Sequence, residues 1–370
     1  MKKVLIKIFF FLMNVIYLFI KLRPVKKQVT LVSRESNRES LDFAMLRIEL
    51  EETYGYKVVV LSKTFEKTAI GLVAYGFHML RQMWEFAASK VVIADTYCII
   101  ISNLKHRKNL RVVQIWHAIS AIKKFGYQTV GKNDGAKKEI AKLMNMHKGY
   151  DYVISASEET DNFFSEAFGI DKKNIVRQGL PRIDYIRKVD QKQTALILKE
   201  YPSLAESNRK IILYAPTIRK GRGIDLHSLF SAFRDDEYIF IVKLHPLDNC
   251  TVKVKKDNVI YDDKFIPYDF LHLADCVISD YSSFAVEASL VDKRLYFYLY
   301  DYDEYKKFTG INIDFDKEAI HPYVAKDTEE LIKIIEREYN SDLMYEFRYK
   351  YVDKSLSNVT KRLGAFIDCI

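Results

Sequence analysis

The chain of 370 residues is long enough for about two domains, each with its own hydrophobic core. Its 49% hydrophobic and 29% charged residues exclude a disordered chain, and its four scattered cysteines form no C-x-x-C pair that would indicate a disulfide framework or a zinc site. The formal charge of +9 favours anionic partners such as phosphates, anionic lipid or nucleic acid, and does not choose among them.

An apolar segment opens the chain. Residues 4–20 are nearly all apolar and have basic residues on both sides, without a small-residue cleavage site that would indicate a signal peptide. Lys7, Asn14 and Lys21 lie on nearly one face of a helix, as a narrow polar stripe beside a broad apolar surface. We expect residues 1–25 to form an amphipathic helix that lies in the membrane interface, with its lysines at anionic headgroups. A short membrane span is the alternative.

Strand-like and helix-like segments alternate in the next part of the chain. Strand patterns occupy residues 29–33, 56–61, 90–94, 111–115, 150–156 and 174–178, with helical patterns at 41–54, 70–89 and 158–168. Repeated β-α units with continuous Val and Ile runs predict a parallel sheet covered on both faces, so residues 26–195 are expected to form a Rossmann-like domain. Residues 126–147, basic and mostly polar, indicate either a mobile loop over a site or a solvated helix and turn.

A histidine follows one of these strands. His117 comes two residues after the end of the strand pattern at 111–115, in the order Trp-His-Ala-Ile-Ser. In open α/β sheets, a side chain at the carboxyl end of a parallel strand points into the crevice where ligands bind. Histidine accepts a proton near neutral pH, so His117 is a candidate general base, and a packed Trp-His pair is the structural alternative. Arg182 and Asp184 follow a later strand and turn, where they either line the crevice or pair with each other.

The second half of the chain repeats the pattern. A charged segment around Pro202 marks the boundary, and residues 205–370 are expected to form a second Rossmann-like domain. Its strand patterns occupy residues 210–215, 239–244, 259–261, 276–279 and 295–300. The loop 217–223 has an anion-binding composition, and polar side chains lie in or after three strands: Thr217, Arg219, Lys243, His245, Asp280, Ser282 and Ser283.

The stretch 276–288 is the most informative part of this half. An apolar strand leads into a turn with Asp280 and two serines, and then into a helix expected at residues 284–290. Ser282 or Ser283 can cap this helix, and Glu287 lies in its early turns. The N-terminus of a helix has unpaired N–H groups and a partial positive charge, so we expect phosphate to bind here; an ordinary capped helix is the alternative.

Two pairs of carboxylates have the spacing of metal ligands. Asp301 and Asp303, and likewise Asp314 and Asp316, have the D-x-D spacing that holds Mg²⁺ or Mn²⁺ in some transferases. Both pairs lie in acidic segments near aromatic residues, where solvated turns are common, and no H-x-x-x-H spacing is present. No metal is therefore expected.

Taken in order, these motifs resemble one family. W-H followed by K-K-x-G, then P-R-x-D, A-P-T-x-R, K-x-H-P and D-Y-S-S are similar to the CDP-glycerol glycerophosphotransferases of teichoic acid synthesis, over roughly residues 90–325. The resemblance implies a GT-B fold, with two Rossmann-like domains facing a central cleft. It also implies an enzyme of the EC 2.7.8 type, without metal or other cofactor, attached peripherally to the cytoplasmic side of the cell membrane.

The resemblance also implies substrates and residue roles. Glycerol phosphate or a related polyol phosphate passes from CDP-glycerol or CDP-ribitol to a lipid-linked acceptor of the undecaprenyl diphosphate type, at an anionic membrane surface and without nucleic acid. His117 and His245 are expected to be catalytic, and the substrate-binding set is Arg182, Asp184, Thr217, Arg219, Lys243, Asp280, Ser282, Ser283 and Glu287. The short chain favours a primase-like member. A GT-B glycosyltransferase that uses a nucleotide sugar and a non-catalytic membrane scaffold are the alternatives.

Overall fold

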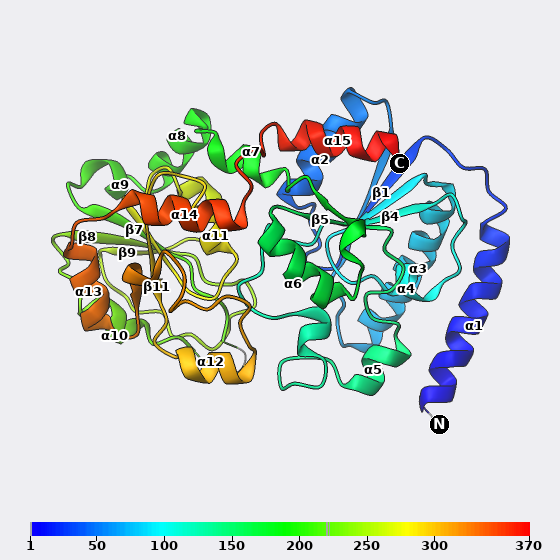
Figure 1. Ribbon diagram of the computed structural model, residues 1–370, viewed down its shortest axis with the longest axis horizontal. Coiled ribbons are helices and arrows are strands. Elements are labelled where there is room, and N and C mark those ends of the chain that lie inside the picture. Colours follow the sequence, from blue (N-terminus) through cyan, green and yellow to red (C-terminus); the bar gives the residue numbers. More distant parts are fainter. Residues whose placement is uncertain (1, 220, 222) are drawn as a thin grey trace. The chain divides into compact units, whose positions relative to one another are not determined.

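The computed structural model describes residues 2–219, 221 and 223–370. Lys220 and Arg222, two cations of the predicted anion-binding loop, lie outside the described residues. The chain divides into two compact units (Figure 1). The first unit holds the residues up to 119 together with 124–184 and 353–370, and the second holds residues 120–123 and 185–352.

The unit boundaries differ from the predicted domain boundaries. The predicted boundary between residues 195 and 205 moves to residue 185, and residues 353–370 return to the first unit. The return has a packing cause, because the last helix, α15 (Val359–Cys369), lies against α2 (Leu41–Glu52). Gly364 approaches Glu49 so closely that a Cβ atom would lie 2.8 Å from the Glu49 side chain, which makes glycine the residue suited to this contact.

A six-stranded sheet forms the centre of the first unit, in the order β2-β1-β3-β4-β5-β6. All its pairs are parallel, as predicted. The strands are β1 (Gln28–Ser33), β2 (Lys57–Ser62), β3 (Val91–Ala94), β4 (Arg111–Gln114), β5 (Tyr152–Ser155) and β6 (Ile175–Arg177). The strand order reverses between β1 and β3, so the carboxyl ends of these strands form the switch point at which open α/β sheets bind ligands.

Capped helices connect these strands. Ser40, Thr68 and Ser157 each accept a hydrogen bond from a backbone N–H in the first turn of the helix that follows. Besides α2 and α15, the helices are α1 (Lys2–Ile20), α3 (Ala69–Ala88), α4 (Ile99–Asn103), α5 (Lys138–Leu143) and α6 (Glu158–Phe168), with 3₁₀ turns η1 (Gly126–Thr129) and η2 (Lys172–Asn174). The segment 126–147 therefore contains a 3₁₀ turn and a short helix, which agrees with the predicted helix and turn rather than with a loop.

A second parallel sheet forms the centre of the second unit, in the order β12-β11-β10-β7-β8-β9. Its strands are β7 (Lys210–Tyr214), β8 (Tyr238–Val242), β9 (Val259–Tyr261), β10 (Cys276–Ser279), β11 (Arg294–Tyr298) and β12 (Val324–Ala325). Every residue of β8 and of β10 is buried, which agrees with a parallel sheet covered on both faces. The order reverses between β7 and β10, so the switch point lies at the turns that follow these two strands.

The helices of the second unit are short. They are α8 (Gln191–Glu200), α9 (Ser203–Glu206), α10 (Leu226–Ser231), α11 (Phe284–Ala288), α12 (Tyr302–Phe308), α13 (Thr328–Glu336) and α14 (Ser341–Tyr351), with 3₁₀ turns η3 (Pro267–Phe270) and η4 (His321–Tyr323). One further helix, α7 (Arg182–Arg187), contains the chain division at residue 185.

The predicted amphipathic helix is present as α1, but its polar stripe faces the protein. The Asn14 side chain donates to the Asn103 carbonyl at 3.1 Å and accepts from the Lys105 N–H at 2.9 Å, and the Lys21 ammonium donates to the Lys105 carbonyl. Tyr17, 1% exposed, packs in the core of the first unit. Backbone groups of α4 and the α4–β4 loop therefore bind Asn14 and Lys21 of this stripe, and the contact of the lysines with lipid headgroups stays a prediction.

The opposite face of α1 consists of apolar side chains that remain exposed. Phe11 and Phe19 are 67% and 66% exposed, and the residues 3–20 are long and apolar enough to cross a membrane by length and composition. The neighbouring helix α3 adds Ile70 and Phe77, which are 84% and 69% exposed. We call this surface of α1 and α3 the apolar face; Figure 1 shows the two helices side by side.

Candidate active site

His117 follows β4, beside the switch point of the first unit. Its Nδ1 lies 3.2 Å from the backbone carbonyl oxygen of Asp95, which follows the neighbouring strand β3. Since a carbonyl oxygen can only accept, this bond assigns the ring proton to Nδ1 and leaves the lone pair on Nε2. The half-buried His117 can therefore receive a proton from a substrate hydroxyl at Nε2.

The residue before this histidine has a strained backbone. Trp116 has a φ of 57°, in the left-handed region, which typically costs about 1–3 kcal/mol for a residue other than glycine. Its ring stacks on Phe125 with centroids 4.5 Å apart and lies 4.1 Å from the ring of His117. The Trp-His packing that the sequence left open is thus present, and it orients the His117 ring. Ala118, which follows the histidine, has no positive φ.

Arg182 and Asp184 do not pair with each other. The Arg182 guanidinium forms a buried ion pair with Asp42 and donates a 3.0 Å hydrogen bond to the backbone carbonyl of His117. Asp184 accepts from the N–H and the hydroxyl of Thr360, both at 2.8 Å, so its carboxylate caps α15. These contacts favour positioning roles for both residues over the substrate contacts predicted from the sequence.

Asp95 is a buried carboxyl group that the sequence reasoning missed. It is 3% exposed, and its Oδ1 has no hydrogen-bond partner within the described part of the chain. Burial disfavours the charged form and raises the pKa of Asp95 to about 7, although hydroxyls of Ser33 and Thr96 partly oppose the rise. Its place after β3 was the available signal, because β3 and β4 end at the same edge of the sheet.

The raised pKa makes the stability of the protein depend on pH. Below about pH 4 the carboxyl is neutral in both states; between about 4 and 7 it ionises only in the unfolded chain, so the folded state loses stability as the pH rises. We expect Asp95→Asn to raise the free energy of unfolding at pH 8 by on the order of 2–4 kcal/mol, with no gain at pH 4. Urea unfolding at both pH values measures this, with the exposed Asp257→Asn as control. An equal gain at both pH values would contradict it.

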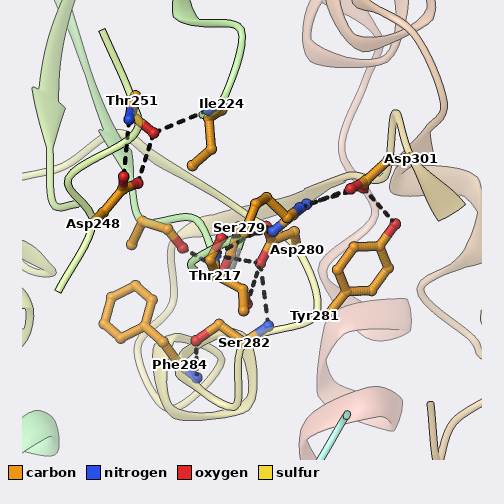
Figure 2. A network of polar contacts seen from close by, with 12 residues as sticks. Thr217, Ile224, Asp248, Thr251, Ser279, Asp280, Tyr281, Ser282, Phe284 and Asp301 are labelled. Atoms are coloured by element: carbon orange, nitrogen blue, oxygen red, sulfur yellow. Dashed lines mark hydrogen bonds and ion pairs between the residues drawn. The ribbon is translucent and has the colours of Figure 1, made fainter. Parts of the chain in front are cut away.

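Asp280 joins two turns at the switch point of the second unit, as Figure 2 shows. Its carboxylate accepts from the Thr217 N–H at 2.9 Å, the Thr217 hydroxyl at 2.7 Å and the Ser282 N–H at 3.2 Å. Arg219 adds an ion pair of 2.8 Å to the same carboxylate. Because Asp280 is 1% exposed and its oxygens are engaged in these bonds, the geometry favours fixing of the two turns over the predicted direct contact with the donor.

Arg219 lies between two carboxylates. Besides Asp280, it pairs with Asp301 at 2.7 Å, and the Tyr281 hydroxyl also donates to Asp301 at 3.1 Å. The rings of Tyr281 and Tyr305 stack with centroids 3.9 Å apart, and the guanidinium lies 5.1 Å from each centroid. Two carboxylates more than balance one guanidinium, so this cluster has no surplus positive charge for a phosphate. Arg219 therefore holds the turn after β7, which contains Thr217, in place.

His245 follows β8, and its ring proton lies on the other nitrogen from that of His117. Its Nδ1 accepts a 3.1 Å hydrogen bond from the Leu247 N–H, so the proton of the neutral ring is on Nε2. The Thr251 hydroxyl donates to Asp248 at 2.6 Å and accepts from the Ile224 N–H at 2.9 Å, which ties the His245 loop to the loop after β7 (Figure 2). A fixed N–H donor of this kind stabilises negative charge that develops on a phosphate.

Two further predicted ligands are engaged inside the protein. The ammonium of Lys243, which is 9% exposed, donates to the Asp262 carboxylate, to the Asp262 carbonyl at 2.9 Å and to the Phe265 carbonyl at 2.6 Å. These acceptors use all three N–H groups of the ammonium. Glu287, 2% exposed, accepts from the Tyr268 hydroxyl at 2.6 Å. The structure thus favours structural roles for both side chains.

Ser282 and Ser283 remain the accessible hydroxyls of this turn, since both are half-buried. The Ser282 Oγ accepts from the Phe284 N–H at 3.3 Å, and Ser283 occupies the N-cap position without a side-chain cap bond. The helix that follows, α11, is five residues long, shorter than expected. The hydroxyls and the short helix start still present N–H and O–H donors beside Thr217 at the switch point.

Among the residues that the structure describes, no group of three or more His, Cys, Asp or Glu side chains is arranged to hold a metal ion. Asp301, of the D-x-D pair Asp301 and Asp303, is engaged by Arg219 and Tyr281.

Comparison with known proteins decides the family of the chain. The family model described as CDP-Glycerol:Poly(glycerophosphate) glycerophosphotransferase matches residues 15–367. The chain belongs to this family. Its membership confirms the family and the enzyme class predicted from the motifs, a CDP-glycerol glycerophosphotransferase-like phosphotransferase.

Individual members of the glycerophosphotransferase family are similar over almost their whole length. A teichoic acid ribitol-phosphate primase of Bacillus spizizenii is 30% identical, with 94% of this chain and 92% of the relative covered. A teichoic acid glycerol-phosphate primase of Bacillus subtilis is 29% identical, with 97% and 96% covered. A variant of the wall teichoic acid polymerase TagF has a TM-score of 0.70 at 18% identity, covering 93% of this chain and 89% of that one. This likeness confirms the GT-B fold class of two Rossmann-like units.

Proposed function

We propose that this glycerophosphotransferase-family enzyme transfers a polyol phosphate from a CDP-polyol to a lipid-linked acceptor in the synthesis of teichoic acid or a related cell-surface polymer. The observation that carries the proposal is the opposite proton placement on two strand-end histidines. His117 offers a lone pair on Nε2, and His245 offers an N–H at Nε2. One histidine thus suits the role of base and the other that of donor, the two roles that a phosphoryl transfer to a hydroxyl requires.

The proposed reaction is a direct displacement at the phosphorus that carries the polyol. The acceptor hydroxyl gives its proton to His117 Nε2 as its oxygen attacks, and a new P–O bond forms. The P–O bond to CMP breaks, and CMP leaves with the electron pair. Negative charge grows on the leaving phosphate, where the N–H of His245 and the hydroxyls of Ser282 and Ser283 stabilise it. The residues around Asp280 and Arg219 hold these donors in place.

The polyol is the first property to test. The ribitol-phosphate primase and the glycerol-phosphate primase are 30% and 29% identical to this chain, so sequence identity does not choose between the two polyols. We therefore propose a primase-type enzyme for one of them. Labelled CDP-glycerol, CDP-ribitol and UDP-sugars, each offered with a lipid diphosphate acceptor of the undecaprenyl type, separate the candidates. Transfer from either CDP-polyol supports the proposal, and transfer from a UDP-sugar alone would indicate a glycosyltransferase.

We propose further that no metal or other cofactor is required, so turnover should persist in a chelator.

Membrane attachment through the apolar face forms part of the proposal. Phe11, Phe19, Ile70 and Phe77 are each more than half exposed, and clustered apolar side chains of this size are typical of a surface that meets a membrane or a partner. Polar bonds hold α1 on the first unit along its opposite side, which suits a helix lying in the interface more than one crossing the bilayer. We place this face on the cytoplasmic leaflet, whose anionic lipids attract the basic segment after α1, residues 21–27.

Replacing two phenylalanines of the apolar face with glutamate should release the enzyme from membranes. Phe11→Glu combined with Phe19→Glu removes two apolar side chains, each worth about 1.5–3 kcal/mol when buried, so we expect binding to lipid vesicles to weaken at least about 100-fold. Vesicle co-sedimentation measures the effect. Leu196→Glu, an exposed apolar position on α8, is the control. Deleting residues 1–22 is a poorer test, because Met13 and Tyr17 belong to the core of the first unit. Unchanged vesicle binding would remove the apolar face from the proposal.

A further inference from the structure

A basic cavity lies where the N-terminal half of α1 meets the end of α4 and the helix α5. Its volume is about 620 Å³, within the usual range for small-molecule sites. Three lysines, Lys3, Lys7 and Lys142, line it together with Glu139. Phe10 and Leu143 add apolar surface. All of these residues belong to the first unit, and none belongs to the site described above.

The charge of the cavity is unbalanced. Glu139 pairs with Lys3 at 3.0 Å, an exposed pair of the kind that contributes little to stability and exchanges readily. Within the described residues, Lys7 and Lys142 have no carboxylate partner, so the lining carries a surplus of two positive charges. Ammonium groups that converge on one cavity without carboxylates to match them suit an anion such as a phosphate, which binds as a point-charge partner of lysine.

The position of the cavity indicates where the phosphate comes from. Phe10, which lines the cavity, contacts Phe9 edge-on with ring centroids 5.4 Å apart, and Phe9 is 45% exposed beside the apolar face. Ile140 of α5, next in the chain to the lining residue Glu139, is 48% exposed. Apolar surface therefore leads from the basic cavity to the apolar face of α1. A ligand with a phosphate at one end and hydrocarbon at the other satisfies both parts.

We propose that this cavity binds the phosphate headgroup of an anionic membrane lipid, with Lys7 and Lys142 as its ligands and the acyl chains passing over Phe10 onto the apolar face. The inference rests on the proposed membrane attachment and adds a discrete site to it. A discrete site differs from general attraction to a charged surface because it saturates at one lipid per protein. General attraction needs a membrane and depends only on the number of charges.

A short-chain lipid that stays monomeric in solution separates these cases. Dihexanoyl phosphatidylglycerol below its micelle concentration should bind the full chain saturably, measured by isothermal calorimetry. Lys7→Gln combined with Lys142→Gln should weaken binding at least tenfold. The matched control, Lys26→Gln with Lys67→Gln, removes the same charge from exposed positions near α1 and α3 but outside the cavity and should change little. The absence of saturable binding, or an equal loss in both variants, would overturn the proposal.

Two further arms keep this proposal distinct from the proposed function. Turnover with a soluble short-chain acceptor should be unchanged in the cavity variant, and binding to neutral vesicles should persist through the apolar face. Transfer to a lipid diphosphate acceptor in detergent micelles should also persist. If that transfer fails while binding of phosphatidylglycerol is retained, the cavity holds the acceptor diphosphate and the proposed headgroup site is wrong, whereas the proposed reaction stands.

Discussion

Replacing His117 with alanine should lower turnover by roughly 10²–10⁴-fold, the usual worth of a positioned base. The acceptor hydroxyl is a poor nucleophile until its proton is removed, and the bond from His117 Nδ1 to the Asp95 carbonyl places the receiving lone pair on Nε2. Binding of the CDP-polyol should remain nearly intact, because the turns proposed to hold the donor belong to the second unit. Donor affinity by calorimetry and single-turnover rates at saturating donor measure the two effects separately.

The exposed His321→Ala serves as the control for this experiment, and thermal unfolding shows whether the variant is folded. If donor affinity collapses while turnover at saturating donor survives, His117 is a binding residue and the base lies elsewhere. Asp184 is a weak substitute as the base, because the N–H and hydroxyl of Thr360 engage its carboxylate in the cap of α15.

Replacing His245 with alanine should slow turnover by roughly 10²–10³-fold while folding is retained. Removing one preorganised donor from a developing negative charge typically costs about 2.7–4 kcal/mol in the transition state. The Leu247 N–H donates to Nδ1 of His245, so Nε2 carries the proton. The Nε2–H group stabilises the leaving CMP phosphate more than it stabilises the intact CDP-polyol. We therefore expect kcat to fall more than donor affinity.

Asn249→Ala provides the matched control, since Asn249 is exposed in the same loop and makes no contact with the histidine ring that the structure describes. Single-turnover rates and thermal unfolding should be measured on both variants. A His245→Ala enzyme with near-normal turnover, or one that loses turnover only because it unfolds, would contradict the proposed role.

Local patterns of the sequence determined most of the architecture. Continuous apolar runs such as 91–94, 238–242 and 276–279 became buried parallel strands, because a strand covered on both faces requires apolar residues at consecutive positions. The two histidines and the serines are predicted as site residues because they closely follow such strands, and the carboxyl ends of parallel strands meet at one edge. The order of the motifs determined the family.

The tertiary structure alone decided which polar groups meet. Arg182 pairs with Asp42 rather than with its neighbour Asp184, and Lys243 pairs with Asp262, because a buried charge takes whichever opposite charge the fold brings beside it. The tautomers of the two histidines depend on backbone groups that no local pattern identifies. The polar stripe of α1 was visible in the sequence, but only the backbone groups near Lys105 decided that it faces the protein and that the apolar side remains outward. The spacing of polar and apolar residues predicts the two faces of a helix, but only tertiary contacts determine what each face packs against.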